Sequence, residues 1–139
     1  MNKKILVNRI ECDSCGDIIT SYTVHDFKHC KCGKVFVDGG TEYLHRSANV
    51  YPSTYTELDV YSTDSFEKIR ETFARGGRGK NGDEPLTYVL LKDMSNSWID
   101  ATIDYIEKLY ESPSWFVENV YLKELEYRKE HSIFIKDSE

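Results

Sequence analysis

Apolar residues in the first half of the chain come in short runs that alternate with polar residues. This alternation predicts strands, because successive side chains of a strand point to opposite faces of a sheet. The turn Asp38-Gly39-Gly40 separates two of the runs, since glycine adopts the positive φ that tight turns require. The expected strands cover residues 4–10, 18–24, 34–37, 42–51 and 54–61.

In the second half, apolar residues recur at every third or fourth position, which predicts helices. A first helix is expected to begin at Asp64, whose carboxylate can accept an unpaired backbone N–H, and Glu67 completes a capping box. Ser95 caps a second helix, whose apolar stripe covers residues 99–110. A third helix covers residues 115–130, and the short break before it predicts an antiparallel helical pair.

A loop and two further strands complete the predicted elements. Four glycines lie within residues 75–85, and this density predicts a segment without regular structure. A strand is expected at residues 86–91, and a short final strand at residues 133–135.

Charge and hydropathy narrow the class of protein. The chain has 139 residues and a formal net charge of −6. This acidic balance argues against binding to duplex DNA, which normally requires a positive field. No apolar run is long enough for a membrane span or for the core of a signal peptide. A cytoplasmic location is therefore expected.

All four cysteines lie between residues 12 and 32, in the pattern Cys-x-x-Cys-Gly followed by Cys-x-Cys-Gly. In a cytoplasmic protein such clustering indicates metal binding rather than disulfides. An iron–sulfur cluster would also accept four thiolates, but short strands around compact pairs favour a structural, tetrahedral zinc site. His29 could replace Cys30, because His29 stands three positions before Cys32 as Cys12 does before Cys15. The expected zinc ligands are Cys12, Cys15, Cys30 and Cys32.

The sequence therefore predicts an α+β protein of two modules. Residues 1–50 are expected to form a zinc-ribbon-like module, and residues 51–139 an α+β module. In the second module, a small, mainly antiparallel sheet would pack against the C-terminal helical pair, because each apolar face needs a partner.

Several blocks of sequence stand out beside the cysteine pairs. In the first half these are Val37-Asp38-Gly39-Gly40 and Tyr43-Leu44-His45-Arg46, and in the second half Gly79-Lys80-Asn81-Gly82-Asp83-Glu84-Pro85-Leu86 and Glu124-Leu125-Glu126-Tyr127-Arg128. Together they resemble an uncharacterised, zinc-ribbon-like family of small proteins from Firmicutes phages and prophages. The family pattern has an aromatic residue where this chain has Arg75, so no aromatic role carries over to that position. The resemblance implies a phage accessory protein made during infection, and it implies no particular chemistry.

The glycine-rich segment also carries three cations, Arg75, Arg78 and Lys80. Backbone N–H groups freed by glycine can form a concave nest for an anion, and the cations can add charge-assisted hydrogen bonds. It is not a P-loop, since Asn81 stands where a Ser or Thr is required. The alternative is a flexible, solvated loop. The expected ligand is a phosphorylated nucleotide. Its base would stack on Tyr88 or Tyr127, and Arg128 would supply a further phosphate contact across the interface of a homo-oligomer.

No stretch of the sequence matches a nucleophile, paired-carboxylate or metalloprotease motif, so no catalytic residue is assigned. We expect a non-enzymatic binding protein that acts in phage counter-defence in the host-cell cytoplasm, by sequestering a phosphorylated nucleotide-type immune signal. Two other binding functions stay open. The protein could act as an inhibitor or adaptor of a host protein, or its ribbon could bind single-stranded nucleic acid through Lys28, Lys31 and Lys34.

Overall fold

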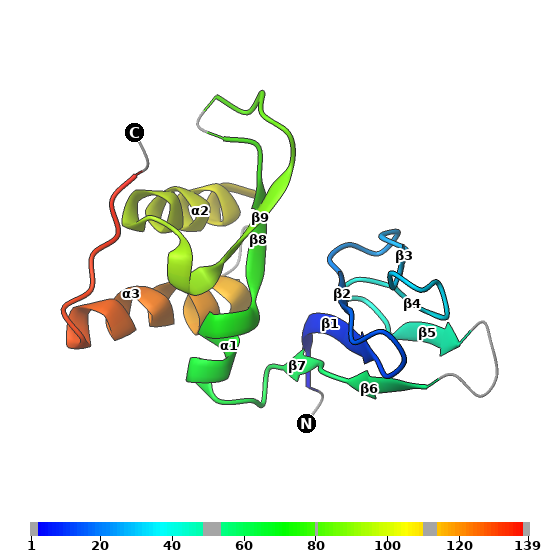
Figure 1. Ribbon diagram of the computed structural model, residues 1–139. Helices are drawn as coiled ribbons and strands as arrows, with labels where there is room; N and C mark the ends of the chain where they lie inside the picture. Colours follow the sequence, from blue (N-terminus) through cyan, green and yellow to red (C-terminus); the bar gives the residue numbers. More distant parts are fainter. Residues whose placement is uncertain (1–2, 49–53, 80, 110–113, 138–139) are drawn as a thin grey trace. The chain divides into compact units, whose positions relative to one another are not determined.

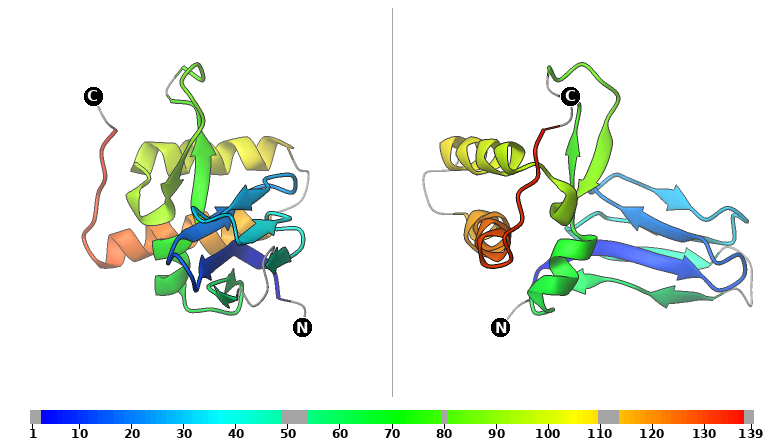
Figure 2. Two further views of the ribbon diagram at one scale, coloured as in Figure 1. Left: turned by 45° about the vertical axis from the view of Figure 1, so that its right-hand side comes forward. Right: turned by 60° about the vertical axis from the view of Figure 1, so that its left-hand side comes forward.

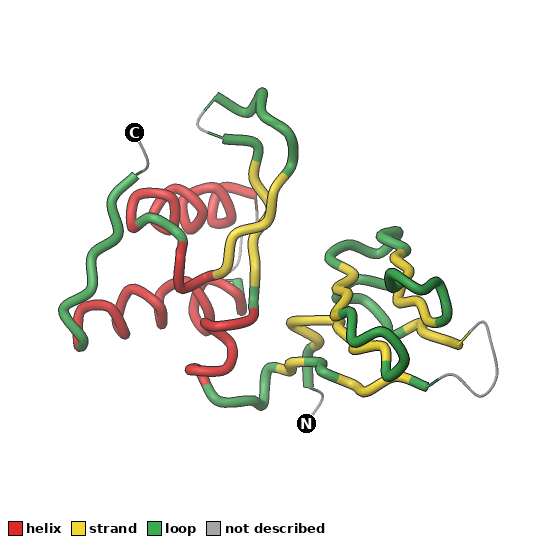
Figure 3. Tube along the Cα trace, in the orientation of Figure 1, coloured by secondary structure: helices red, strands yellow, loops and turns green. Residues whose placement is uncertain are grey.

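The computed structural model describes residues 3–48, 54–79, 81–109 and 114–137 (Figure 1). The chain divides into two compact units, Met1–Ile69 and Arg70–Glu139. Strands and loops make up most of the first unit, whereas helices make up most of the second (Figure 3). The first unit holds all four cysteines, and the second holds the glycine-rich segment.

Two antiparallel sheets form the first unit. In the larger sheet, the central strand β1 (Ile5–Cys12) pairs with β2 (Ile18–Ser21) along one edge and with β6 (Tyr55–Glu57) and β7 (Val60–Tyr61) along the other. The smaller sheet has the order β3 (Lys28–His29), β4 (Val35–Asp38), β5 (His45–Ala48).

Buried and more exposed side chains alternate along β1 and along β4, and the buried ones form the apolar core of the first unit. Ile10 and Cys12 of β1 are buried, and the residue between them is more exposed. Val35 and Val37 of β4 follow the same alternation. These four side chains form one cluster with Ile19 and Cys30. Two of the four cysteines therefore belong to the core of this unit.

The first unit also buries a polar cluster around Asn8. The side-chain amide of Asn8 donates hydrogen bonds of 2.9 Å to the carbonyls of Asp38 and Gly40, and it accepts one from Arg46. Arg46 in turn makes two hydrogen bonds of 2.8 Å to the carboxylate of Asp59. The cluster joins β1, the turn between β4 and β5, and the segment before β7. It stabilises this arrangement because buried polar groups need hydrogen-bond partners.

The turn after β4 depends on its two glycines. Gly39 and Gly40 have φ angles of 102° and 53°, which favour glycine. A Cβ atom at Gly39 would collide with the carbonyl of Tyr43, and one at Gly40 would collide with the backbone of Thr23. The Gly40 N–H donates a hydrogen bond of 2.9 Å to the buried hydroxyl of Ser21. Close backbone approach therefore explains this pair of glycines.

The second unit follows helix α1 (Phe66–Thr72), which is capped by Ser65: its hydroxyl accepts the Lys68 N–H at 3.2 Å. The next elements are a hairpin, a 3₁₀ turn, and two α-helices with a π-helical turn between them. They are β8 (Ala74–Gly77), β9 (Thr87–Leu90), the 3₁₀ turn η1 (Leu91–Asp93), α2 (Asn96–Leu109), the π-helical turn η2 (Val117–Tyr121) and α3 (Leu122–Glu130).

Helices α2 and α3 run antiparallel to each other (Figures 1 and 2). The predicted cap of α2 is confirmed, because the Trp98 N–H donates a hydrogen bond of 3.2 Å to the Ser95 hydroxyl. Met94 and Ile99, which flank the cap, are fully buried. The apolar core of the unit consists of Phe73, Leu91, Met94, Ile99, Val117, Val120 and Tyr121.

The buried face of the last helix, α3, carries two charged residues. Glu124 and Arg128 are buried one turn apart, and the Arg128 Nε donates to the Glu124 carboxylate at 2.7 Å. Arg70 approaches the same carboxylate with hydrogen bonds of 2.8 and 3.0 Å. Arg128 also donates to the side chain of Asn96 at 2.8 Å and to the carbonyl of Leu91 at 3.0 Å. One arginine thus links α3 to the start of α2.

The α+β class, the antiparallel sheets and the helical pair are confirmed. The prediction that residues 75–85 lack regular structure is wrong for residues 75–77, which lie in β8 and pair with β9. The cross-strand hydrogen bonds outweigh the entropic cost of glycine in a strand. Residues 133–135 form no strand; instead, the Ile135 N–H and carbonyl bond to Asn96.

Some boundaries also differ from the prediction. The expected module boundary at residue 50 precedes β6 and β7, yet both strands pair with β1, and the two units divide after Ile69. The first helix begins two residues after Asp64, whose carboxylate instead accepts the Tyr61 N–H at 2.7 Å. The last residues of the predicted strand 42–51 and residue 110 of the predicted helix lie outside the described residues.

Candidate metal centre and ligand pocket

Each cysteine pair lies on a tight turn that is closed by a glycine. Cys12 ends β1, and the N–H of Gly16 donates to its carbonyl at 2.8 Å. Cys30 follows β3, and the N–H of Gly33 donates to its carbonyl at 3.0 Å. Both glycines have a φ of 74°, a conformation that side chains disfavour. The glycine after the second cysteine of each pair is therefore explained by the turn.

The two turns bring the four sulfur atoms together. All four Sγ atoms of Cys12, Cys15, Cys30 and Cys32 lie within 4.8 Å of one another. The distance is 3.7 Å from Cys12 to Cys32 and 3.4 Å from Cys30 to Cys32, and none of the four forms a disulfide. Metal–sulfur bonds of about 2.3 Å in a tetrahedron separate the sulfurs by about 3.8 Å. The cluster could therefore hold a single metal ion.

His29 does not join this cluster. It precedes Cys30, and successive side chains near a strand point to opposite faces. The His29 ring packs instead against Phe27 and Phe36, at centroid distances of 4.7 and 6.0 Å. The sequence allows two ligand sets, and the structure brings together the sulfur atoms of the set with four cysteines.

The ionisation of the thiols is uneven. Burial opposes ionisation of Cys30, but the Val35 N–H and the neighbouring thiols outweigh it and lower the pKa of Cys30 to about 6. For Cys32, a backbone hydrogen bond from Lys34 favours the thiolate. Burial and the other sulfurs oppose it more strongly, so the pKa of Cys32 rises to about 12. Four sulfurs this close cannot all ionise unless a cation neutralises them, and a divalent metal would supply that charge.

Carboxylates beside the ligands anchor both turns. Asp17 accepts the Lys31 N–H at 2.9 Å, which connects the first turn to the second. Asp13 accepts the hydroxyls of Thr54 and Thr56 at 2.6 and 2.7 Å, and these two bonds lower the pKa of Asp13. The first turn is therefore also held to β6.

The two described cations of the glycine-rich segment, Arg75 and Arg78, lie in different elements. Arg75 lies in β8, Arg78 is exposed in the following loop, and Lys80 lies outside the described residues. Within that loop the Glu84 N–H donates to the Arg78 carbonyl at 2.9 Å, and the Glu84 carboxylate lies beside Gly79. A carboxylate at this position opposes the approach of a phosphate.

The other predicted ligand residues are also separate from Arg75. Tyr88 pairs with Gly76, so the alternation of the hairpin places Tyr88 and Arg75 on opposite faces. Tyr127 stacks on His131, with ring centroids 4.0 Å apart. Arg128 is only 1% exposed and is held by Glu124, so it cannot reach a phosphate across a subunit interface.

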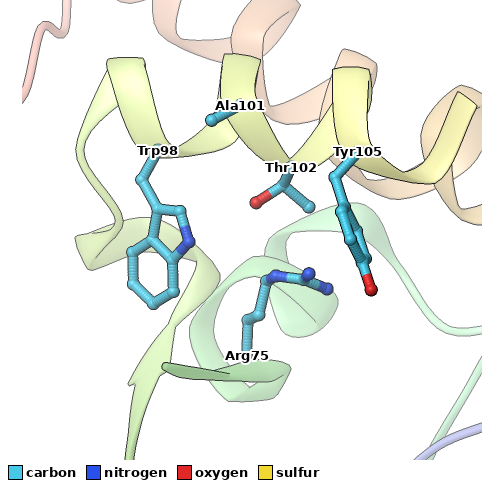
Figure 4. A pocket seen from close by; sticks show the side chains of 5 residues that line it. All are labelled: Arg75, Trp98, Ala101, Thr102 and Tyr105. Atoms are coloured by element: carbon cyan, nitrogen blue, oxygen red, sulfur yellow. The ribbon is translucent and has the colours of Figure 1, made fainter. Parts of the chain in front are cut away.

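Arg75 instead lines a pocket of about 310 Å³ together with one face of α2 (Figure 4). Trp98 and Tyr105 stand on either side, with Ala101 and Thr102 between them (Figure 4). The guanidinium lies across from Thr102 and points towards the Tyr105 side. The pocket therefore combines one positive charge with two aromatic side chains.

Two neighbours hold the walls of the pocket. The Arg75 guanidinium donates to the Tyr121 hydroxyl at 3.5 Å; burial raises the pKa of Tyr121, and the charge of Arg75 opposes that rise. A Cβ atom at Gly77 would lie 2.9 Å from the Trp98 ring. Gly77 therefore leaves room for Trp98, and the π-helical turn supplies Tyr121 as a hydrogen-bond partner of Arg75.

The pocket residues of α2 were not predicted, although a signal for them exists. Trp98, Ala101, Thr102 and Tyr105 follow the spacing i, i+3, i+4, i+7, which marks one face of a helix. Ile99 and Ile103 define the neighbouring, more strongly apolar face, and that stripe dominates the pattern. On this face, two aromatic residues flank two small ones, and this pattern beside the buried face could have indicated a pocket between the aromatic side chains.

A family model matches the N-terminal segment of the chain. The model of a family described as a domain of unknown function (DUF7695) matches residues 4–48. The matched segment runs from β1 to β5 and contains all four cysteines, but it covers less than half of the chain. No curated protein and no solved structure matches. The phage origin stays a prediction. Among the described helices, none is long and apolar enough to cross a membrane.

Proposed function

We propose that this protein is a non-catalytic binding protein with two parts: a ribbon stabilised by zinc, and a second unit that binds a small phosphorylated nucleotide. The observation that carries the ligand proposal is the position of Arg75, in a pocket flanked by Trp98 and Tyr105. A guanidinium offers charge-assisted hydrogen bonds to phosphate, and aromatic rings offer faces on which a base can stack.

The proposal of zinc follows from the chemistry of the donors. Four thiolates around one centre suit zinc, and a site without an open position is structural rather than catalytic. Sulfurs separated by 3.4 and 3.7 Å suit a single ion better than a cluster, whose thiolates bind separate irons. Elemental analysis of the full chain should find one zinc per chain. Stoichiometric inorganic sulfide, or no metal at all, would contradict the proposal.

Two variants test which residues bind the metal. Cys30→Ser should abolish stoichiometric zinc, because it removes one of the four clustered sulfurs. His29→Ala should keep it, because the His29 ring packs against Phe27 and Phe36. The reverse result would establish the ligand set that contains His29.

The ligand proposal also suggests a biological role. In the proposed role, this small binding protein sequesters a nucleotide signal of bacterial immunity. The resemblance to phage accessory proteins supports this role by analogy.

The experiment is a calorimetric titration of the full, metal-loaded chain with mononucleotides, cyclic nucleotides and ADP-ribose. We expect at least one of them to bind with a dissociation constant below about 100 μM. Arg75→Ala should weaken binding at least tenfold. Arg78→Ala is the matched control: it removes the same charge from the exposed loop and should leave the affinity unchanged.

Each other outcome points to a different function. Loss of binding in Arg78→Ala, but not in Arg75→Ala, would show that the ligand binds at the glycine-rich loop instead. Failure of every nucleotide would refute the proposal and favour an inhibitor or adaptor of a host protein. Single-stranded nucleic acid is the weaker alternative, because Lys28 is already paired with Asp26 and with the carbonyl of Thr20.

A further inference from the structure

The buried hydroxyl of Thr102 distinguishes this pocket from a site that binds phosphate alone. Thr102 is 2% exposed, and its Oγ1 has no hydrogen-bond partner among the described residues. A threonine inside a helix can bond to the carbonyl four residues earlier, but this one does not. Native proteins rarely leave a buried hydroxyl unpaired, so an unpaired one that lines a pocket points to a ligand atom as its partner.

We infer that the pocket binds a single nucleobase with one phosphate, a nucleoside monophosphate, and that Thr102 reads the edge of the base. The inference rests on the proposed function and adds the size, orientation and selectivity of the ligand. The base would stack on Trp98, and the phosphate would meet the guanidinium of Arg75 near the Tyr105 side of the pocket (Figure 4).

The arrangement of α2 supports this orientation. Trp98 and Tyr105 are seven residues apart on one helix face, which separates them by about 10 Å along the axis. The small side chain of Ala101 and the Thr102 hydroxyl lie between them, so one planar ring can lie against Trp98 with its edge towards the hydroxyl. Tyr105 is 57% exposed and forms the outer wall.

Size and charge favour one nucleotide over two. The volume of about 310 Å³ lies at the lower end of the range for small-molecule sites, roughly 300–1,000 Å³. Arg75 supplies the only positive charge among the five described lining residues, which suits one phosphate. A cyclic dinucleotide would bring a second phosphate, for which the described lining residues offer no further positive charge.

The test compares ligands that differ by one part. Adenosine and uridine monophosphates, cyclic di-adenosine monophosphate and ribose 5-phosphate are titrated separately into the full, metal-loaded chain. We expect a mononucleotide to bind at least tenfold more tightly than either ribose 5-phosphate or the cyclic dinucleotide. Equal binding of ribose 5-phosphate, or tighter binding of the cyclic dinucleotide, would overturn this inference while leaving the proposed phosphate site intact. Failure of all four would overturn this inference, and failure of every nucleotide in the wider titration would overturn the proposed function as well.

Two variants test the contacts. Trp98→Leu should weaken mononucleotide binding at least tenfold and leave any binding of ribose 5-phosphate unchanged. Thr102→Val keeps the shape of the side chain and removes the hydroxyl. It should weaken mononucleotide binding about fivefold and raise the melting temperature of the free protein, because an unpaired buried hydroxyl is destabilising. A lower melting temperature with unchanged affinity would show that the hydroxyl is structural and would refute its role as a reader.

Discussion

The two units of this protein have nearly the same number of residues but bury different chemistry. Residues 1–69 combine a cluster of apolar side chains with a polar network and four cysteines. Residues 70–139 combine an apolar core that includes Phe73 and Tyr121 with an Arg–Glu–Arg network. The core of the first unit includes two of the four clustered cysteines, so metal binding is expected to supply much of its stability. The second unit should be stable without metal.

The buried polar groups of the two units have a common lesson. Asp59 in the first unit and Glu124 in the second each accept hydrogen bonds from an arginine that links separate segments. Buried ion pairs of this kind contribute little net stability, because desolvation offsets their attraction, but removing one partner is costly. We infer that both networks select the arrangement of segments, whereas the apolar cores provide most of the stability that the protein has without metal.

The largest expected effect is metal removal, because the site contributes about 10 kcal/mol or more in comparable zinc modules. A chelator should unfold residues 1–69 while α2 and α3 stay folded. Hydrogen exchange with mass spectrometry, read separately over the two units, measures this. Loss of protection in both units at the same chelator concentration would show that their stabilities are coupled.

Glu124→Ala should have the next largest effect, a loss of about 3–5 kcal/mol, since it leaves two arginines without their shared carboxylate. Chemical denaturation followed by helical circular dichroism measures it. Glu126→Ala on the same helix is the control, because Glu126 is exposed. Equal losses in the two variants would contradict the assignment of Glu124 to the core.

The apolar core of the second unit predicts a graded pair of losses. Ile99 is fully buried, so Ile99→Ala should lower stability by about 2–5 kcal/mol. Leu125 is half-buried, and Leu125→Ala should cost about 1–2 kcal/mol, because less apolar surface is removed from its packing. If the order of the two losses were reversed, the buried face of the helical pair would be misassigned.

The smallest effect belongs to the residues that support the metal turns. Thr56→Val removes the hydroxyl that donates to Asp13 and should lower the stability of the first unit by about 1 kcal/mol or less. Zinc stoichiometry should stay at one. The measurement is zinc affinity by competition with a chromophoric chelator, in which a change above about tenfold would show that this bond positions a ligand directly.

Sequence reasoning was most successful where local spacing carries the chemistry. The two cysteine pairs, the glycines after them and the cap at Ser95 follow from short patterns, because each depends on neighbours in the chain. It was less successful in the glycine-rich segment, where residues 75–77 were expected to lack regular structure but form part of β8. The strand alternation of β8 directs Arg75 to α2 instead, and no short-range pattern reports that partner.

The amino-acid sequence by itself determined that this protein has an α+β fold, a four-cysteine cluster and an amphipathic helical pair, because periodicity and spacing encode them locally. Tertiary structure alone decided that Glu124 and Arg128 are buried, that Asn8 and Arg46 share a polar core, and which side chains meet Arg75. The physical reason is that a charged or polar side chain is expected to be exposed unless a partner distant in sequence pairs with it in the core. In two of these cases the paired residues are at least 38 positions apart in the sequence.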